Sequence, residues 1–121
     1  MAKIYDLKKR TYAYALDVIK FLRELPKDYI SQTIGKQLLR SATSIGANIT
    51  EGQSASSKKE FANFYSYSLK SANETKFWLE LLRDSGGINS PARLSSILNE
   101  TGEISKIIAS SIITLKRNQN F

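Results

Sequence analysis

Residues 37–52 read QLLRSATSIGANITEG, and this stretch decides the fold. Placed on an α-helix at about 100° per residue, it separates into two stripes. The apolar stripe consists of Leu38, Ala42, Ile45 and Ile49. The polar stripe lies about a quarter-turn away and consists of Gln37, Ser41, Ser44, Asn48 and Glu51. Because a solvated face carries more charge than this, the polar stripe predicts a hydrogen-bonding seam pressed against another helix.

The rest of the chain divides into helices at clear stop and start signals. Pro26 ends the first helix, since it disfavours the α conformation of the preceding residue and has no amide hydrogen. Residues 57–60 (SKKE) have the form of a capping box, in which the Ser57 hydroxyl and the Glu60 carboxylate bond each other's backbone amides. Gly86-Gly87 ends the third helix, and Ser90-Pro91 begins the fourth. The four helices are expected at about 6–25, 32–52, 58–85 and 91–116.

The connections between these helices are short, and no segment shows the alternation of a β-strand. Short connections place consecutive helices antiparallel, so the sequence predicts an all-α, up-down-up-down four-helix bundle. A chain of 121 residues has room for one hydrophobic core, and residues 1–121 are expected to form one domain. The start of the second helix stays open, because Asp28, Ser31 and Thr33 are all competent N-caps.

The composition argues against most catalytic and metal-binding chemistry. The chain has no cysteine and no histidine, which removes disulfides, thiolate metal sites and the commonest general base. It also has no Gly-x-x-x-x-Gly-Lys phosphate loop. Glu100 and Glu103 share a helix face, but without a histidine beside them we expect them to be solvated. We therefore expect no catalytic residue, no metal site and no cofactor, in a protein that is not an enzyme.

The expected location follows from what the sequence lacks. No apolar run approaches the roughly 20 residues of a membrane span. Residues 1–6 lack the apolar core of a secretion signal. The absence of cysteine also fits a reducing compartment. We expect a cytoplasmic protein with no membrane partner.

The charge balance favours an anionic partner. The chain carries 18 lysine and arginine residues against 11 aspartate and glutamate residues, a net charge of +7. Nucleic acid is the first candidate, and without a base-reading motif it would be bound through its phosphates. The alternative is a solvated face that keeps the protein soluble. The candidate nucleic-acid-binding residues are Lys8, Lys9, Arg10, Lys20, Arg23 and Lys27.

Several large apolar residues fall outside the stripes that face the core. The first helix has a wider apolar sector than one bundle neighbour needs, and the third has apolar residues on its far side. The alternative is that these apolar residues are exposed singly on the surface, as is common in soluble proteins. We predict a homo-oligomer, with the candidate interface residues Tyr5, Tyr12, Leu16, Phe77 and Leu81.

The polar stripe has a structural and a ligand-binding interpretation. In the first, its members pair with one another and with the third helix and fix the register. In the second, Arg40 joins Asn48 and Glu51 among hydroxyls as an anion or small-ligand site. The full candidate set is Gln37, Arg40, Ser41, Ser44, Asn48 and Glu51.

The sequence also resembles a known family. Residues 37–52 resemble the signature of the 23S rRNA intervening-sequence protein family, also called the four-helix-bundle protein family. Residues 57–61 (SKKEF), 71–75 (SANET) and 78–82 (WLELL) resemble its third helix, and the resemblance covers roughly residues 6–90. It implies a four-helix bundle that assembles into a ring-like homopentamer. A relative with this architecture, the accessory variability determinant protein of diversity-generating retroelements, binds nucleic acid and a reverse transcriptase.

Two functional hypotheses follow from charge, apolar surface and resemblance together. In the first, the protein is a non-enzymatic, oligomeric helical bundle that binds RNA or DNA non-specifically through its basic surface clusters. In the second, it is an oligomeric scaffold that recruits a protein partner, such as a nucleic-acid enzyme, and its charge serves solubility.

Overall fold

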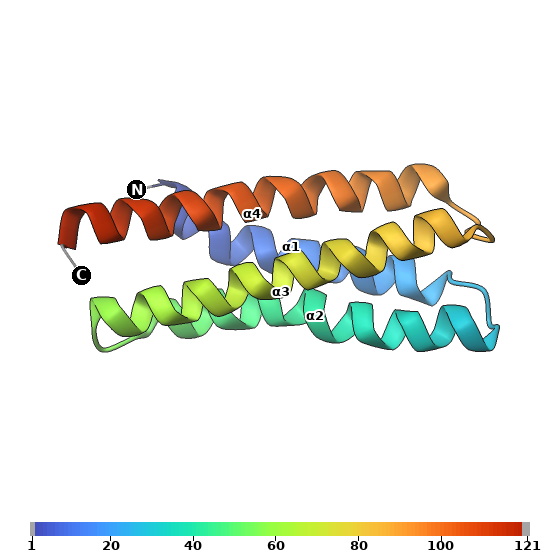
Figure 1. The fold of residues 1–121 in the computed structure, drawn as a ribbon, viewed down its shortest axis with the longest axis horizontal. Helices are drawn as coiled ribbons and strands as arrows, with labels where there is room; N and C mark the ends of the chain where they lie inside the picture. Colours follow the sequence, from blue (N-terminus) through green and yellow to red (C-terminus); the bar gives the residue numbers. More distant parts are fainter. Residues whose placement is uncertain (1, 120–121) are drawn as a thin grey trace.

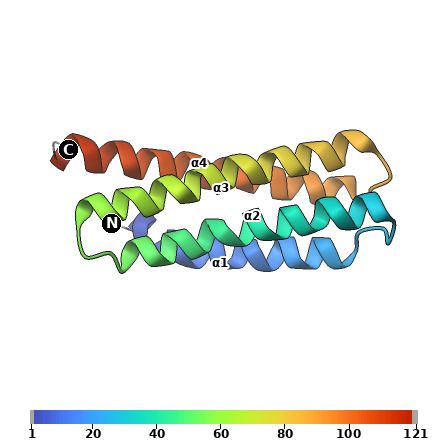
Figure 2. The same cartoon turned by 60° about the horizontal axis from the view of Figure 1, so that its bottom comes forward.

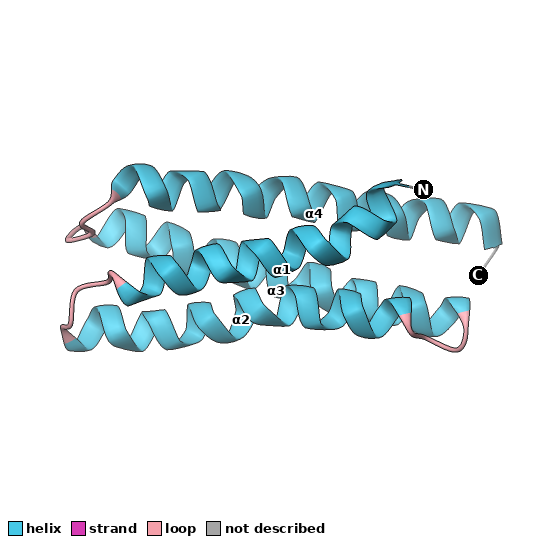
Figure 3. Cartoon of the chain, turned by 180° about the vertical axis from the view of Figure 1, so that it is seen from behind, coloured by secondary structure: helices cyan, strands magenta, loops and turns pink. Residues whose placement is uncertain are grey.

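The chain folds into four long helices that lie side by side (Figures 1 and 3). The computed structural model describes the backbone of residues 2–119 and the side chains of residues 7–117. The helices are α1 (Ala2–Arg23), α2 (Tyr29–Gln53), α3 (Lys58–Ser85) and α4 (Pro91–Gln119). Consecutive helices run antiparallel, and no strand occurs within residues 2–119. The predicted all-α, up-down-up-down bundle is therefore confirmed.

Each of the four helices touches two neighbours, in the cyclic order α1, α2, α3, α4. Figure 2 shows α1 and α2 on one side of the bundle and α3 and α4 on the other. The α2–α3 pair has the most extensive contact, and α1 packs less extensively against α2 and α4. α1 and α3 occupy diagonal corners. Surfaces on the outer sides of α1 and α3 therefore face away from each other.

The helix ends follow the local signals in the sequence. Asp28 is the N-cap of α2, because its Oδ1 accepts the backbone amide of Ser31 at 2.9 Å. Ser57 caps α3 by accepting the amide of Glu60 at 3.1 Å, while the Glu60 carboxylate accepts the amide of Ser56. The Glu60 carboxylate therefore bonds the amide of Ser56, one residue before the Ser57 amide that the capping-box motif predicts. At the far end of α3, Gly86 and Gly87 both have positive φ, which glycine adopts without strain.

The first helix ends earlier than expected. Its last helical residue is Arg23, and the amides of Glu24 and Leu25 continue into tighter bonds to Phe21 and Leu22 carbonyls at 3.0 and 3.2 Å. This tightening releases the chain from the helix just before Pro26, where an α conformation is disfavoured.

The core lies along the bundle axis and contains the whole apolar stripe of the deciding stretch. Leu38, Ala42, Ile45 and Ile49 are all fully buried. They meet buried residues of the other three helices: Leu7, Tyr14, Val18, Phe21, Tyr65, Ala72, Leu79, Leu82, Leu94, Ile104 and Ile108. On α3 the small residues Ser68, Ala72 and Thr75 are buried opposite α2, which allows this pair to pack closely.

Candidate functional site

The buried part of the polar stripe joins α2 to α3 through hydroxyl groups. Ser41 is buried, and its Oγ lies 2.9 Å from the Oγ1 of Thr75 in a hydrogen bond. One turn along, the Ser68 hydroxyl donates to the carbonyl of Ile45 at 2.8 Å. No buried side-chain polar atom of residues 7–117 lacks a partner. The buried polar groups of this junction are therefore all hydrogen-bonded, and such a satisfied network fixes how two helices pack.

The other members of the polar stripe form hydrogen bonds within α2 or face solvent, so hydrogen bonding to α3 does not continue along the whole stripe. Ser44 and Asn48 are half-buried and bond back to carbonyls of their own helix, at 2.8 and 2.9 Å. Gln37 is also half-buried, and Glu51 is exposed. The physical reason is that serine and asparagine satisfy themselves locally on the preceding turn, so a polar face need not press on a neighbour.

Arg40 and Glu51 lie about three turns apart along α2 and have different neighbours. Arg40 forms an ion pair with Glu74 of α3 and donates to Gln37 at 3.0 Å. The indole of Trp78 donates to the same Glu74 carboxylate at 3.0 Å. Glu51 instead lines a hollow between α1 and α2 that neither Arg40 nor Asn48 reaches. The small-ligand site expected from these three residues is not formed.

An open, mostly apolar groove runs along the junction of α1 and α2. Its main hollow has a volume of about 890 Å³, and a smaller one of about 150 Å³ continues it along the same junction. We call the two together the α1–α2 furrow. The larger hollow is lined by Lys8, Lys9, Thr11, Tyr12, Ala15, Leu16, Ile19, Thr43, Gly46, Ala47, Thr50 and Glu51. The smaller one is lined by Leu22, Leu25, Gln32, Gly35, Lys36 and Leu39.

Small residues explain why the furrow exists. The two helices come close where Gly46 faces Thr11, since a Cβ at Gly46 would lie 3.1 Å from the Thr11 hydroxyl oxygen. Thr43, Ala47 and Thr50 give α2 a low wall, while Tyr12 and Leu16 of α1 stand above it. The helices therefore touch at the base of the furrow and leave it open above.

The predicted interface residues lie in two separate places. Tyr12 and Leu16 line the α1–α2 furrow and are 69% and 44% exposed. Phe77 and Leu81 are on α3, 55% and 40% exposed. The side chain of Tyr5 lies outside the described residues. The structure thus leaves both groups open to solvent in the monomer, and it separates them onto diagonal helices.

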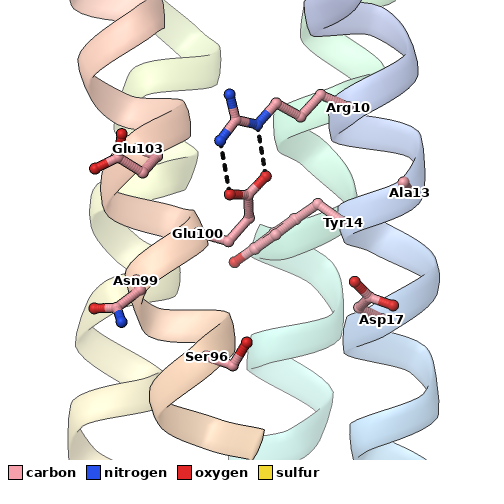
Figure 4. Close-up of a pocket in the computed structure, with 8 residues that line it drawn as sticks. All are labelled: Arg10, Ala13, Tyr14, Asp17, Ser96, Asn99, Glu100 and Glu103. Atoms are coloured by element: carbon pink, nitrogen blue, oxygen red, sulfur yellow. Dashed lines mark hydrogen bonds and ion pairs between the residues drawn. The ribbon is translucent and has the colours of Figure 1, made fainter.

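Five of the six predicted nucleic-acid-binding residues are exposed cations: Lys8, Lys9, Lys20, Arg23 and Lys27. Arg10 differs, because its guanidinium makes a two-pronged ion pair with Glu100 of α4, at 2.7 and 2.8 Å (Figure 4). This hydrogen bonding to Glu100 raises the pKa of Arg10 above its ordinary value. Arg10 is therefore a contact between helices rather than a free cation, and Glu100 is not a solvated carboxylate.

Arg10 and Glu100 stand at a polar pocket between α1 and α4 that sequence reasoning missed (Figure 4). It has a volume of about 400 Å³ and is lined by Arg10, Ala13, Tyr14, Asp17, Ser96, Asn99, Glu100 and Glu103. Tyr14 closes its inner side, with its hydroxyl 2.5 Å from Thr101 Oγ1. Burial raises the pKa of Tyr14 to about 12. Its acidic side chains form no cluster suited to a metal ion within the described part of the chain.

Ion pairing leaves the surface charge unevenly distributed. Glu24, Glu74, Asp84, Glu100 and Glu103 are each paired with a cation. Among the residues whose side chains are described, Lys8, Lys9, Lys20, Arg23 and Lys27 have no such partner. Cations without an ion pair also occur on the other helices, at Lys36, Lys59, Lys70, Lys76, Lys116 and Arg117, so the five predicted cations are one group among several in the described part of the chain.

Comparison with known proteins agrees with this architecture. Residues 3–110 match the family model described as 23S rRNA-intervening sequence protein. The chain belongs to this family. A solved structure from Bacteroides thetaiotaomicron VPI-5482, described as a protein of unknown function from the S23 ribosomal protein family, is 37% identical to this family member and superposes with a TM-score of 0.83. The match covers 91% of this chain and 97% of that one. No curated protein matches the chain.

The family assignment confirms the resemblance seen in residues 37–52 and the bundle that it implies. The solved relative is itself described as having unknown function, so it supports the fold rather than an activity. Across the helical residues that the structure describes, no helix combines the length and the hydropathy that a bilayer crossing requires.

Proposed function

We propose that this 23S rRNA-intervening sequence protein is a non-enzymatic, self-associating helical bundle that binds the phosphate backbone of RNA or DNA through cations on the outer face of α1. The observation that carries the proposal is the row of unpaired cations on this helix. Lys9, Lys20 and Arg23 are spaced so that they share one face of α1, while Lys8 lies beside Lys9 and Lys27 follows in the connection to α2.

The dimensions of the row suit a nucleic-acid strand. From Lys9 to Arg23 the helix rises about 21 Å, which spans about six phosphates of one duplex strand. The exposed side chains of α1 in this range are lysine, arginine, tyrosine, leucine, alanine and one carboxylate, Asp17, so the helix offers charge and apolar surface but no amide to read base edges. Binding through this face depends on salt and hardly on sequence.

The test compares two triple variants that lose the same charge. Lys9→Ala/Lys20→Ala/Arg23→Ala removes cations from α1, and Lys59→Ala/Lys70→Ala/Lys76→Ala removes exposed cations from α3. Binding to a generic RNA duplex is measured by fluorescence anisotropy over a salt series. We expect the α1 variant to lose most of its affinity and about two to three contacts in the salt slope, while the α3 variant keeps both. Equal losses in the two variants, or no binding by the wild type at low salt, would contradict the proposal.

The α1–α2 furrow favours a second candidate, a scaffold that recruits a protein partner. An apolar groove between two helices is a common receptor for a helix of another protein. Nuclease-treated capture with the wild type and with Leu16→Glu distinguishes this candidate. A heterologous protein retained by the wild type and lost by Leu16→Glu supports recruitment, and retention by both variants argues against the furrow.

A further inference from the structure

Tyr29 projects into solvent at the end of the bundle where α1 passes into α2 (Figure 1). Among the large apolar side chains of residues 7–117, that of Tyr29 is the most exposed, at 82%. It is the first residue of α2 and follows the short connection that contains Pro26 and Lys27. The folded monomer makes little use of this ring, so its replacement should leave the core intact.

The backbone that carries this ring is held by local hydrogen bonds. Asp28, just before it, is the N-cap of α2. The side-chain amide of Gln32 donates to the carbonyl of Pro26 at 2.9 Å, and the Thr33 hydroxyl donates to the carbonyl of Tyr29 at 2.8 Å. The ring therefore projects from an ordered element, which lowers the entropy cost of a ligand that packs against it.

The charged groups of the connection leave positive charge beside this ring. Lys27 precedes the ring by two residues, and Arg23 is the last residue of α1; both are exposed cations without an ion pair. Of the two acids in the same connection, Glu24 is paired with Arg93, and the carboxylate of Asp28 accepts a backbone amide. This end of α1 therefore favours an anionic ligand.

An exposed aromatic ring beside unpaired cations is suited to single-stranded nucleic acid. The cations contact the phosphates, and the ring stacks on the flat face of a base. In a duplex that face is covered by the neighbouring base pairs, whereas the bases of a single strand can be splayed out to stack on a protein side chain. A ring in this place therefore adds affinity for a single strand and not for a duplex.

The direction of the cation row favours a strand over a lipid surface. The cations of α1 follow the length of the bundle, and Tyr29 stands beyond the end of their row (Figure 1). A strand laid along α1 meets the cations and then the ring. A flat anionic membrane at this end would meet Tyr29, its exposed neighbour Ile30 and Lys27, but not Lys9, which lies about 21 Å along the helix from Arg23.

We infer that the nucleic acid bound along α1 is single-stranded, and that one of its bases stacks on Tyr29 while Lys27 and Arg23 contact the flanking phosphates. This inference rests on the proposed function and names the class of nucleic acid that the same surface takes. Because every base has a flat face, it predicts a preference for single strands with little preference for sequence.

Three single variants test the role of the ring. Tyr29→Ala removes it, Tyr29→Phe keeps an aromatic face, and Ile30→Ala removes a 63% exposed neighbour that has no such face. Binding of an oligouridine strand and of an RNA hairpin duplex is measured by fluorescence anisotropy at low salt. We expect the wild type to prefer the strand, and Tyr29→Ala to lose roughly 5- to 100-fold in affinity for the strand and nothing for the duplex. Tyr29→Phe and Ile30→Ala should bind like the wild type, and circular dichroism should show equal helicity for all four proteins.

Photochemical cross-linking locates the stacked base independently of affinity. A strand that carries 5-iodouracil joins preferentially to an aromatic ring lying against the base. Trypsin, which cleaves after Lys27 and Lys36, releases residues 28–36 (DYISQTIGK), in which Tyr29 is the one aromatic residue. We expect the cross-link on this peptide in the wild type and not in Tyr29→Ala. A cross-link confined to other peptides would overturn the inference.

The outcomes separate this inference from the proposed function. Equal affinity for strand and duplex, a preference for the strand that Tyr29→Ala keeps, or an equal loss of duplex binding in Tyr29→Ala overturns the stacking and leaves the phosphate contacts of α1. Failure to bind either nucleic acid at low salt overturns both. Binding to phosphatidylcholine–phosphatidylserine vesicles that is lost in both Tyr29→Ala and Ile30→Ala would assign this end of the bundle to a lipid surface instead.

Discussion

The two sides of α2 show opposite solutions to helix packing. Toward α3 the junction is polar and closed, with Ser41 bonded to Thr75 and Ser68 bonded to the Ile45 carbonyl. Toward α1 the junction is apolar and open, with Tyr12 and Leu16 exposed above a wall of small residues. In this bundle, the polarity of a helix face therefore does not by itself indicate whether that face is buried or exposed. The polar side is closed within the monomer, and the apolar side leaves an open groove.

We expect the largest difference in unfolding free energy between a substitution in the core and one in the α1–α2 furrow. Ile45→Ala removes a fully buried side chain, and we expect it to lower the free energy of unfolding by about 2–5 kcal/mol. Leu16→Ala, at a substantially exposed residue, should change it by about 0.5 kcal/mol or less in the monomer. Urea unfolding of both variants measures the difference. Similar losses would show that the furrow contributes to the folding core and would break the comparison.

Alkaline unfolding extends the comparison to the α1–α4 junction. The pKa of Tyr14 in the fold is about 12, above its ordinary value of 10, because burial disfavours the phenolate. A raised folded-state pKa gives stability that is complete below pH 10 and is lost as the pH rises toward 12. At 1.36 kcal/mol per tenfold change in proton affinity, this stability is on the order of 2–3 kcal/mol.

Tyr14→Phe should remove this part of the alkaline loss, at a cost of about 1 kcal/mol near neutral pH for the lost bond to Thr101. Chemical denaturation at pH 8 and pH 11 measures both effects. An unchanged alkaline slope in Tyr14→Phe would show that other groups, such as Tyr65, whose pKa burial also raises, carry the pH dependence.

A smaller loss of stability is expected at the polar junction between α2 and α3. Thr75→Val keeps the shape of the side chain but removes the hydroxyl that bonds Ser41, and we expect a loss of about 1–2 kcal/mol. Adding Ser41→Ala should cost less in Thr75→Val than in the wild type, because the hydroxyl pair is then already broken and Ser41 keeps only its bond to the Leu38 carbonyl. A double-mutant cycle by urea unfolding measures the coupling between the two residues. Zero coupling would mean that the junction depends on close packing alone.

The sequence predicts the fold well because helix periodicity and caps are local signals. Leu38, Ala42, Ile45 and Ile49 recur at helical spacing, and all four are buried. Asp28 was one of three competent caps, and the choice among them depends on where the preceding connection leaves the chain. Local patterns therefore give the helices, and tertiary contacts decide their last residues.

The candidate surfaces were less predictable because periodicity locates a residue around its own helix, not against a neighbour. It groups Ser44, Asn48 and Glu51 with Ser41, although Ser41 bonds to α3, Ser44 and Asn48 bond to carbonyls of α2, and Glu51 is exposed. It also placed Arg10 among the free cations, since its partner Glu100 is 90 residues away in the chain. Matching charged residues across helix pairs of the expected bundle is the one sequence signal that would have found this ion pair.

Sedimentation equilibrium of the wild type and Leu16→Glu over a range of concentrations tests the central claim most directly. The claim is that the side of α2 facing α1 serves self-association and the side facing α3 serves folding. We predict that the wild type assembles, and that Leu16→Glu stays monomeric with unchanged helicity. Identical mass distributions for the two proteins, or unfolding of Leu16→Glu, would contradict it.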